Sequence, residues 1–174
     1  MSGPLTRVAH QVKRSYAGTA QRPLGGYLAV LGTYAGVVGT LSGAALALGR
    51  RPPERVPAGD LVLFSVATHK LSRLLAKDSI LSPLRAPFTG YQEPAGEGEL
   101  NEEVRGQGVR HAVGELVTCP FCVGVWIATG FFAGTVFAPR MTRLVAGTFA
   151  AVAGADMLHL GYDAAKEGVR KLSS

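Results

Sequence analysis

The 174-residue chain has few charged residues and only two cysteines. Asp, Glu, Lys and Arg make up 17% of it, whereas a soluble domain carries about a quarter. The apolar residues, 47% of the chain, come in long blocks and do not alternate with polar ones. Two cysteines three positions apart cannot build the disulfide framework of a small secreted domain. These features exclude a disulfide scaffold and favour a membrane protein.

Signatures of several function classes are also missing. We find no Ser–His–Asp order, no phosphate-binding loop and no pair of buried carboxylates, so the sequence gives no positive indication of an enzyme. The net charge is +6, but basic residues do not interleave with aromatic ones as they do in nucleic-acid-binding proteins. We therefore expect no nucleic-acid partner. Lys and Arg are expected to set the orientation in the membrane and to contact membrane lipids.

Long apolar runs predict an all-α, polytopic membrane protein with about four transmembrane helices and a flexible cytoplasmic loop. About 20 apolar residues cross a hydrocarbon core of about 30 Å as a helix. The expected spans are residues 27–48, 60–77, 116–138 and 144–162. Outside them we expect a basic N-terminal arm over 1–26, an acidic, Gly-rich cytoplasmic loop over 78–114, and a polar tail over 163–174.

The second predicted span differs from the others because one of its faces is charged. Lys70, Arg73 and Lys77 follow helical spacing and fall on one side. Such a helix either crosses the membrane facing a bundle interior or lies on the surface, which gives four or three spans. With four spans and both termini inside, eleven Lys and Arg residues lie inside and five outside. The positive-inside rule favours this arrangement, so we expect a multi-pass bacterial membrane protein with cytoplasmic termini.

Two of the charges inside the predicted spans lie at similar depth. Arg73 is in the second span, and Asp156 is in the fourth. An unpaired charge in hydrocarbon is costly, so we predict that these two side chains form an ion pair across the bundle. The alternative is that each side chain reaches water separately.

Glycines recur at four-residue spacing within the predicted spans. In lipid, small residues at this spacing let a neighbouring helix approach closely. We predict close helix packing at these positions, and we also expect a protein partner or a homo-oligomer. The alternative is that the pattern only reflects the 23 glycines of the chain. The positions are Gly32, Gly36, Gly39, Gly43, Gly130 and Gly134.

A CPFC segment, Cys119 to Cys122, opens the third predicted span. Pro120 suits a first helical turn, and Cys119 or the preceding Thr118 can act as the N-cap. Both cysteines then lie on one helix face, where free N–H groups and the positive helix end favour a thiolate at Cys119. Glu115 either accepts a proton from a thiol or raises the thiol pKa by repulsion, and the spacing does not decide between these roles.

Three hypotheses follow for the CPFC segment. It is a thiol–disulfide redox pair, although the cytoplasm keeps thiols reduced. It binds a soft metal such as zinc, which would require His111, Glu115, Asp78 or a second subunit to complete four ligands. Otherwise its thiols are structural packing groups in a scaffold or recruitment protein. We favour the structural hypothesis and expect no cofactor, with the redox or metal-binding protein as the alternative.

Two segments carry the patterns D-x-I-x-x-P-L-R and E-L-x-x-C-P-x-C-x-G-x-W, and the first follows an Arg-containing helix. Together they resemble a bacterial membrane family, domain of unknown function 1360, which includes a sporulation-associated branch. The resemblance covers about residues 60–160 and implies a small integral membrane protein without an established activity. The matching positions are Arg73, Asp78, Ile80, Pro83, Leu84, Arg85, Glu115, Leu116, Cys119, Pro120, Cys122, Gly124 and Trp126.

Overall fold

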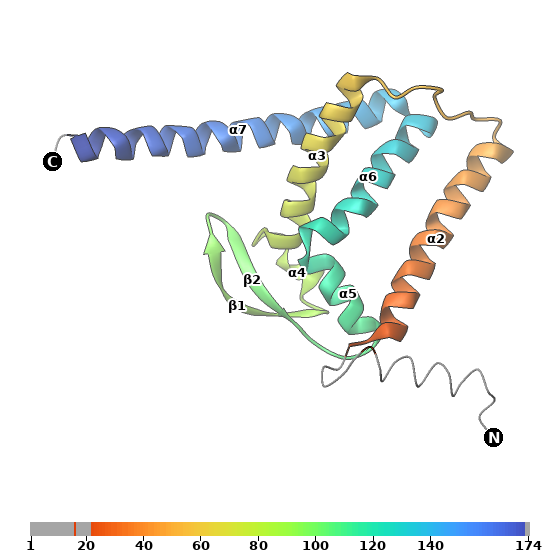
Figure 1. The fold of residues 1–174 in the computed structure, drawn as a ribbon, viewed down its shortest axis with the longest axis horizontal. Coiled ribbons are helices and arrows are strands. Elements are labelled where there is room, and N and C mark those ends of the chain that lie inside the picture. Colours follow the sequence, from red (N-terminus) through yellow and green to blue (C-terminus); the bar gives the residue numbers. More distant parts are fainter. Residues whose placement is uncertain (1–15, 17–21, 173–174) are drawn as a thin grey trace.

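The computed structural model describes residue 16 and residues 22–172. The described chain is mostly helical, and one antiparallel hairpin lies between two of its shorter helices (Figure 1). The expected N-terminal arm lies largely outside the described residues, as do the last two residues of the polar tail. The elements are α2 (Leu24–Ala47), α3 (Ala58–Lys77), α4 (Ser82–Arg85), β1 (Thr89–Gly96), β2 (Glu99–Val104), α5 (Val109–Thr118), α6 (Pro120–Phe137) and α7 (Pro139–Leu172).

Three helices in the described part of the chain are long and apolar enough to cross a membrane, namely α2, α6 and α7. They correspond to the first, third and fourth predicted spans, although α7 continues as one helix through most of the predicted polar tail. The second predicted span does form a helix, α3, but this helix carries several charged residues in its second half and is not one of the three. The prediction of four spans is therefore not confirmed.

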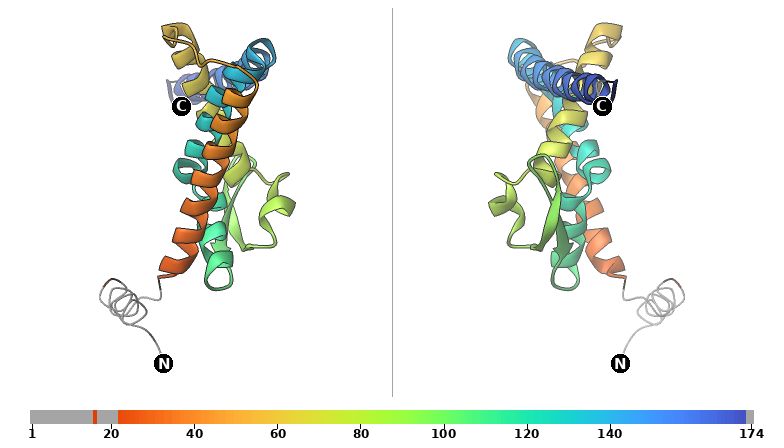
Figure 2. Two further views of the ribbon diagram at one scale, coloured as in Figure 1. Left: turned by 90° about the vertical axis from the view of Figure 1, so that its right-hand side faces the viewer. Right: turned by 90° about the vertical axis from the view of Figure 1, so that its left-hand side faces the viewer.

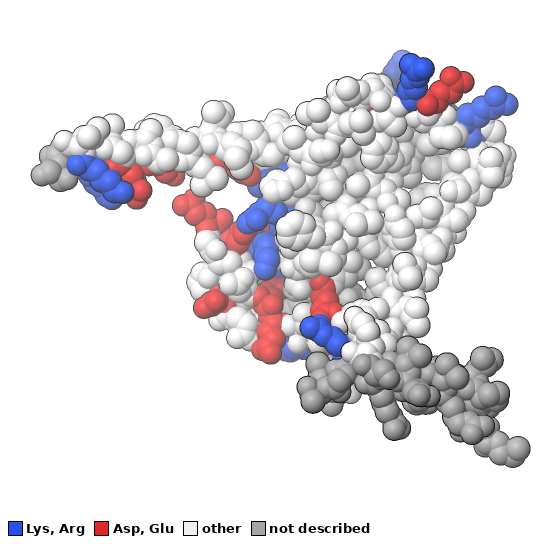
Figure 3. Space-filling view, viewed as in Figure 1, with Lys and Arg blue, Asp and Glu red and all other residues white. Residues whose placement is uncertain are grey.

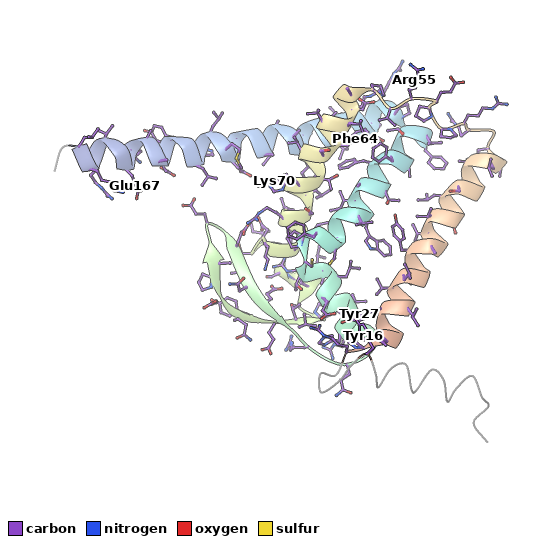
Figure 4. The ribbon with its side chains drawn as sticks, in the orientation of Figure 1. Tyr16, Tyr27, Arg55, Phe64, Lys70 and Glu167 are labelled. Atoms are coloured by element: carbon purple, nitrogen blue, oxygen red, sulfur yellow. The ribbon has the colours of Figure 1, made fainter. Side chains whose placement is uncertain are left out.

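Helix α3 is the central helix of the fold, since α6 and α7 both pack against it. A buried apolar cluster joins Phe64 and Ala67 of α3 to Phe131 of α6 and Ala146 of α7. The rings of Phe64 and Phe131 stack with their centroids 5.5 Å apart, and Figure 4 shows Phe64 on α3 beside α6. A helix that carries several charged residues thus packs against two of the apolar helices.

Of the six glycines that were predicted to pack closely against a neighbouring helix, one does so within this chain. A methyl group placed on Gly134 would come within 2.5 Å of the Thr142 hydroxyl oxygen, at the turn between α6 and α7. The other five glycines named above would meet no atom within 4 Å, so within this chain the prediction is wrong for them. Four of these five lie on α2, which runs beside α6 with a gap between the two ribbons in Figure 1 and makes few contacts with it.

Two glycines without a GxxxG spacing also make close approaches. A methyl group on Gly26 of α2 would overlap the Gly108 carbonyl, and one on Gly114 of α5 would lie 2.5 Å from Val104 Cγ1. These contacts place α5 between the beginning of α2 and the hairpin. Tight packing at glycines therefore occurs at the hairpin end of the molecule as well as at the α6–α7 turn.

The segment 78–114 was predicted to be a flexible loop, and this prediction is wrong. It contains α4, the β1–β2 hairpin and half of α5, so the fold is not all-α. Low apolar content suggested disorder, but this segment is ordered by hydrogen bonds and by packing against α3 and α5. Gly96 and Gly98 adopt positive φ angles of 135° and 76° at the hairpin turn, which glycine tolerates best. Figure 2 shows the hairpin projecting to one side of the helices.

The predicted ion pair between Arg73 and Asp156 is not formed. Asp156 binds Lys70, with 2.6 Å between Nζ and Oδ2, and Arg73 binds the Glu99 carboxylate of β2 through Nε and Nη2, at 3.1 and 2.5 Å. Lys70 and Arg73 share a face of α3, so spacing alone did not tell which of them meets α7. The unpredicted hairpin supplies the partner of Arg73, which leaves Lys70, one turn earlier, for Asp156.

We predict that exchanging the charges of Lys70 and Asp156 restores stability that either single reversal lowers. Lys70→Glu and Asp156→Lys should each lower the melting temperature of the protein in detergent, because each places like charges together. The double variant should recover a coupling of about 1 kcal/mol, the size typical of a partly exposed pair.

The matched control combines Arg73→Glu with Asp156→Lys. This double variant should show no recovery, because Arg73 and Asp156 have different partners. Recovery in the control and none in the Lys70 variant would show that the pairing described here is incorrect.

Candidate functional site

Arg85, the last residue of α4, is almost fully buried although it is charged. Its side chain is 1% exposed, and that of its partner Glu102 is 5% exposed. Arg85 Nε and Nη2 donate to the two carboxylate oxygens of Glu102, at 2.8 and 3.0 Å. A two-point arginine–carboxylate pair of this kind fixes orientation as well as distance. It joins α4 to β2.

The same guanidinium also binds the end of α3. Nη1 donates to the Leu75 carbonyl at 3.0 Å, and Nη2 donates to the Asp78 carbonyl at 2.9 Å. The last carbonyls of a helix lack partners within the helix, and a cation at this end also interacts favourably with the negative end of the helix dipole. The Thr89 hydroxyl lies 3.0 Å from Glu102 Oε2 and completes the cluster. One side chain therefore holds α3, α4 and the hairpin together.

The D-x-I-x-x-P-L-R motif forms the turn that brings Arg85 to this position. Asp78 lies just after α3, and its Oδ1 accepts a hydrogen bond from the Ile80 N–H at 2.8 Å. Pro83 is in the first turn of α4, where its missing N–H costs nothing. The Ser79 N–H donates to the Gly98 carbonyl at 2.9 Å and fastens the turn to the hairpin. The motif is therefore a folded connection between α3 and the hairpin.

The second motif places the two cysteines at the junction of α5 and α6. Cys119 is the N-cap of α6 and Pro120 is its first residue, as the sequence predicted. The Cys122 N–H donates to the sulfur of Cys119 at 3.3 Å, and the two sulfurs lie 2.7 Å apart with the Cys122 thiol donating. Both thiols are free, and Cys122 is exposed. The structure thus brings the candidate redox pair into direct contact.

Glu115 lies one helical turn before Cys119 but binds other residues. Its Oε1 lies 3.1 Å from Arg22 Nη1 and 3.4 Å from His111 Nε2. Figure 4 shows Tyr27, near the beginning of α2, beside α5. Within the described residues no hydrogen bond joins Glu115 to either cysteine. Glu115 therefore links the beginning of α2 to α5.

The predicted metal ligands do not converge within one chain. Among the described residues, no three His, Cys, Asp or Glu side chains are grouped so that they could hold a metal ion. His111 turns toward Glu115, and its Nδ1 lies 3.3 Å from the Gly106 carbonyl. Asp78 is engaged at the end of α3. Within the proposed set, Cys119 meets Cys122 and His111 meets Glu115, but these two pairs do not come together as one group.

The remaining motif residues position α6 between α3 and α2. A methyl group on Gly124 would lie 3.8 and 3.9 Å from side-chain atoms of Thr68 and Ser72, so this glycine faces α3. On the α2 side, the ring of Trp126 contacts the ring of Tyr34 edge-on, with centroids 5.1 Å apart. These contacts hold the helix that carries the cysteines on two sides.

The residues of both motifs lie in the part of the chain that matches a known family. The family described as protein of unknown function (DUF1360) matches residues 63–162. The chain belongs to this family. The match runs from α3 into α7, includes the hairpin and both motifs, and leaves out α2, which confirms the resemblance drawn from the sequence.

A relative of this chain is the sporulation protein YjcA of Bacillus subtilis (strain 168). The two are 42% identical over 71 residues, which are 39% of this chain and 60% of that protein. The similarity therefore spans less than two thirds of the relative. No solved structure matches this chain.

The sequence did not reveal four residues that take part in these contacts. They are Glu102 and Thr89 in the Arg85 cluster, Glu99 as the partner of Arg73, and Lys70 as the partner of Asp156. The first three lie on the hairpin, which was read as disordered. A signal was present, because the Gly-Glu-Gly turn at 96–98 separates two short segments in the way that hairpin turns do. Nothing in the sequence marks Glu102, among five carboxylates between residues 93 and 103, as the buried one.

We predict that Arg85→Met unfolds the hairpin while the membrane helices persist. Removing one member of a buried ion pair leaves the other charge uncompensated, which costs about 3–5 kcal/mol. Amide hydrogen exchange across β1 and β2 should rise accordingly. Arg85→Lys should not restore protection, because lysine lacks the planar fork.

The matched control is Arg105→Met, which removes an exposed arginine whose Nη2 donates to the Ala86 carbonyl at 3.0 Å. Hairpin exchange should change little in this variant. Equal protection of the hairpin in wild type and Arg85→Met would contradict the role assigned to the pair.

Proposed function

We propose that this chain is an integral membrane protein that presents a rigid polar platform to protein partners at the cytoplasmic face. The platform consists of α4, the β1–β2 hairpin and α5. The observation that carries the proposal is the buried Arg85–Glu102 pair, which fastens this charged surface to the end of α3. A flexible loop would lose conformational entropy on binding a partner, whereas a preorganised surface avoids most of that loss.

The distribution of charge supports insertion in a membrane. Figure 3 shows charged side chains at the turn between α2 and α3 and around the hairpin, with an uncharged band over the helices between them. Helices α2, α6 and α7 have the length and apolar character of spans. We infer that α3 is the fourth, because α6 and α7 pack against it and because Lys70 and Arg73 are both paired.

Orientation follows from the basic residues. The four-span topology puts Arg22, Arg85, Arg105 and Arg110 on the same side as the basic N-terminal arm, and by the positive-inside rule we infer that the platform end faces the cytoplasm. The opposite end holds the ion pair between Asp60 and Arg143, 2.7 Å apart, at the beginnings of α3 and α7. Most of β1 is exposed and Tyr91 is 61% exposed, which leaves the platform surface available to a partner.

We predict that a cysteine at Tyr91 reacts only from the cytoplasmic side, and that a bound partner shields it. In a Cys119→Ser/Cys122→Ser background, Tyr91→Cys should label with an impermeant maleimide in inverted vesicles but not in intact cells. A high-salt wash should raise its labelling rate, because salt weakens contacts between exposed charges.

The control position is Arg51→Cys at the opposite end, which should label from outside and should not respond to salt. Labelling of Tyr91→Cys from outside would overturn the orientation. An unchanged rate after the wash, with Tyr91→Cys labelled only from inside, would argue against a salt-sensitive partner on the platform.

A second candidate function is thiol–disulfide exchange by Cys119 and Cys122. The observation that favours it is the 2.7 Å contact between the two sulfurs at the beginning of α6. Free N–H groups at a helix N-terminus stabilise a thiolate. In the exchange, the dithiol would become a disulfide while a disulfide of a partner protein would be reduced to two thiols. This step requires only the pair itself and the partner.

We predict that a redox role makes the pair shift readily between dithiol and disulfide in the cell. A membrane-permeant alkylating reagent would trap free thiols, and mass spectrometry would count them before and after mild oxidant. Cys122→Ser should accumulate a mixed disulfide between Cys119 and the partner, because the second thiol that would resolve this disulfide is missing.

A metal chelator provides the comparison with metal binding. Protection from alkylation that the chelator removes would favour a metal shared between subunits. If both thiols stay reduced and respond neither to the oxidant nor to the chelator, the CPFC segment keeps only a structural role at the beginning of α6.

A further inference from the structure

A cavity of about 600 Å³ lies between α3, the tip of the hairpin and α7. We call it the α3–α7 cleft. In Figure 3 the molecule is hollowed between α7 and the hairpin, and Figure 4 shows Lys70 on α3 at this place. Neither cysteine lines the cleft, so it is separate from the CPFC segment. Its charged lining residues are Lys70, Arg73, Asp78, Glu97, Glu99 and Asp156.

Two ion pairs hold the walls of the cleft in place. Lys70 of α3 binds Asp156 of α7, and Arg73 of α3 binds Glu99 of β2. Each cation keeps donor capacity beyond its partner. A lysine ammonium has three N–H groups, and Arg73 uses Nε and Nη2 on Glu99, which leaves Nη1. The cleft therefore still offers donors to a phosphate group.

Carboxylates outnumber cations in the cleft. Glu97 and Asp78 form no ion pair with any residue that the structure describes. The lining holds two cations and four carboxylates, which gives a net charge of −2 when its histidines, His69 and His159, are neutral. A ligand that carries only negative charge would be repelled overall, whereas a zwitterion can place its positive group near the carboxylates that form no ion pair and its negative group near the two cations. The cleft thus favours a zwitterion with a cation placed near Glu97.

Besides Asp156 and His159, the α7 wall of the cleft carries apolar side chains. Met157 and Leu160 of α7 line the cleft and are 59% and 56% exposed. The C-terminal part of α7 projects away from the other helices (Figure 1). Leu74 adds a third apolar side chain from α3. A charged wall facing an apolar wall matches an amphiphile, whose polar head and hydrocarbon chain require different surroundings.

We propose that the α3–α7 cleft binds one aminophospholipid of the cytoplasmic leaflet. The primary ammonium of the head group donates to Glu97 and Asp78, and the phosphate accepts from Lys70 and Arg73. The acyl chains lie along Met157 and Leu160. A primary ammonium is required because its N–H groups donate hydrogen bonds, which a quaternary ammonium cannot do. The proposal rests on the membrane location proposed above.

The test uses the purified full-length chain in detergent and native mass spectrometry. Phosphatidylethanolamine, phosphatidylcholine and phosphatidylglycerol with identical acyl chains would be added in competition. We expect one phosphatidylethanolamine to be retained about tenfold better than either competitor, the effect of one charge-assisted hydrogen bond. Equal retention of the three lipids, or preference for phosphatidylglycerol, would overturn the proposal.

Three variants locate the binding. Glu97→Gln should lose the roughly tenfold preference for phosphatidylethanolamine, since the amide side chain carries no negative charge. Glu93→Gln, on the same hairpin but outside the cleft, should keep it. Leu160→Trp should lower retention of all three lipids by filling the apolar side. If Glu97→Gln binds as wild type does, or if Glu93→Gln loses the preference equally, the assigned site is wrong.

A soluble head group distinguishes a lipid from a free metabolite. Phosphoethanolamine should displace the lipid poorly, because it lacks the chains that contact α7. If it competes as well as the lipid does, the ligand is a soluble zwitterion and the lipid assignment is overturned. Lipid retention is measured without reference to membrane sidedness or partner shielding, so its outcome is separate from that of the Tyr91→Cys labelling.

Discussion

The fold depends on one buried cation at the end of its central helix. Arg85 lies where α3 stops, and its N–H groups reach two backbone carbonyls and both oxygens of a carboxylate on β2. Each of these groups would be costly to bury alone, and each is satisfied only when α3, α4 and the hairpin are all in place. This mutual requirement explains how a segment poor in apolar residues forms an ordered structure. Its order comes from polar groups that complete one another.

Along helix α3, too, charged groups are satisfied by partners from other parts of the fold. Its charged residues meet partners from different elements, at Arg143 near its beginning, Asp156 near its middle and Glu99 near its end. Between these pairs lies the aromatic and alanine cluster that packs on α6 and α7. A helix with this much charge is poorly suited to contact lipid, but it is well suited to the interior of a bundle, where its charges find partners. The apolar helices α2, α6 and α7 can then be the ones that face lipid.

Local features of this chain were largely predictable, and its long-range partners were not. The apolar runs located α2, α6 and α7, and Pro120 with Cys119 located the beginning of α6, because these signals are confined to a few consecutive residues. The pairing of Arg73 failed because it depends on a hairpin whose strands contain little that is apolar. The glycine prediction failed for a related reason. Spacing tells which residues share a helix face, but it does not tell which face meets another helix.

The hairpin connects the two polar features of the molecule. Its strand β2 carries Glu102 at the root, where Arg85 holds it, and Glu99 near the tip, where Arg73 holds it at the edge of the α3–α7 cleft. The root pair is almost completely buried, whereas Arg73 is 47% exposed. A buried pair resists solvent competition, and an exposed pair exchanges readily with other anions. A phosphate in the cleft would bind the Nη1 group of Arg73 that Glu99 leaves free, so that Arg73 would join the ligand to the tip of the hairpin. Occupancy of the cleft would therefore hold the tip of the platform in place, while the Arg85–Glu102 pair holds its root.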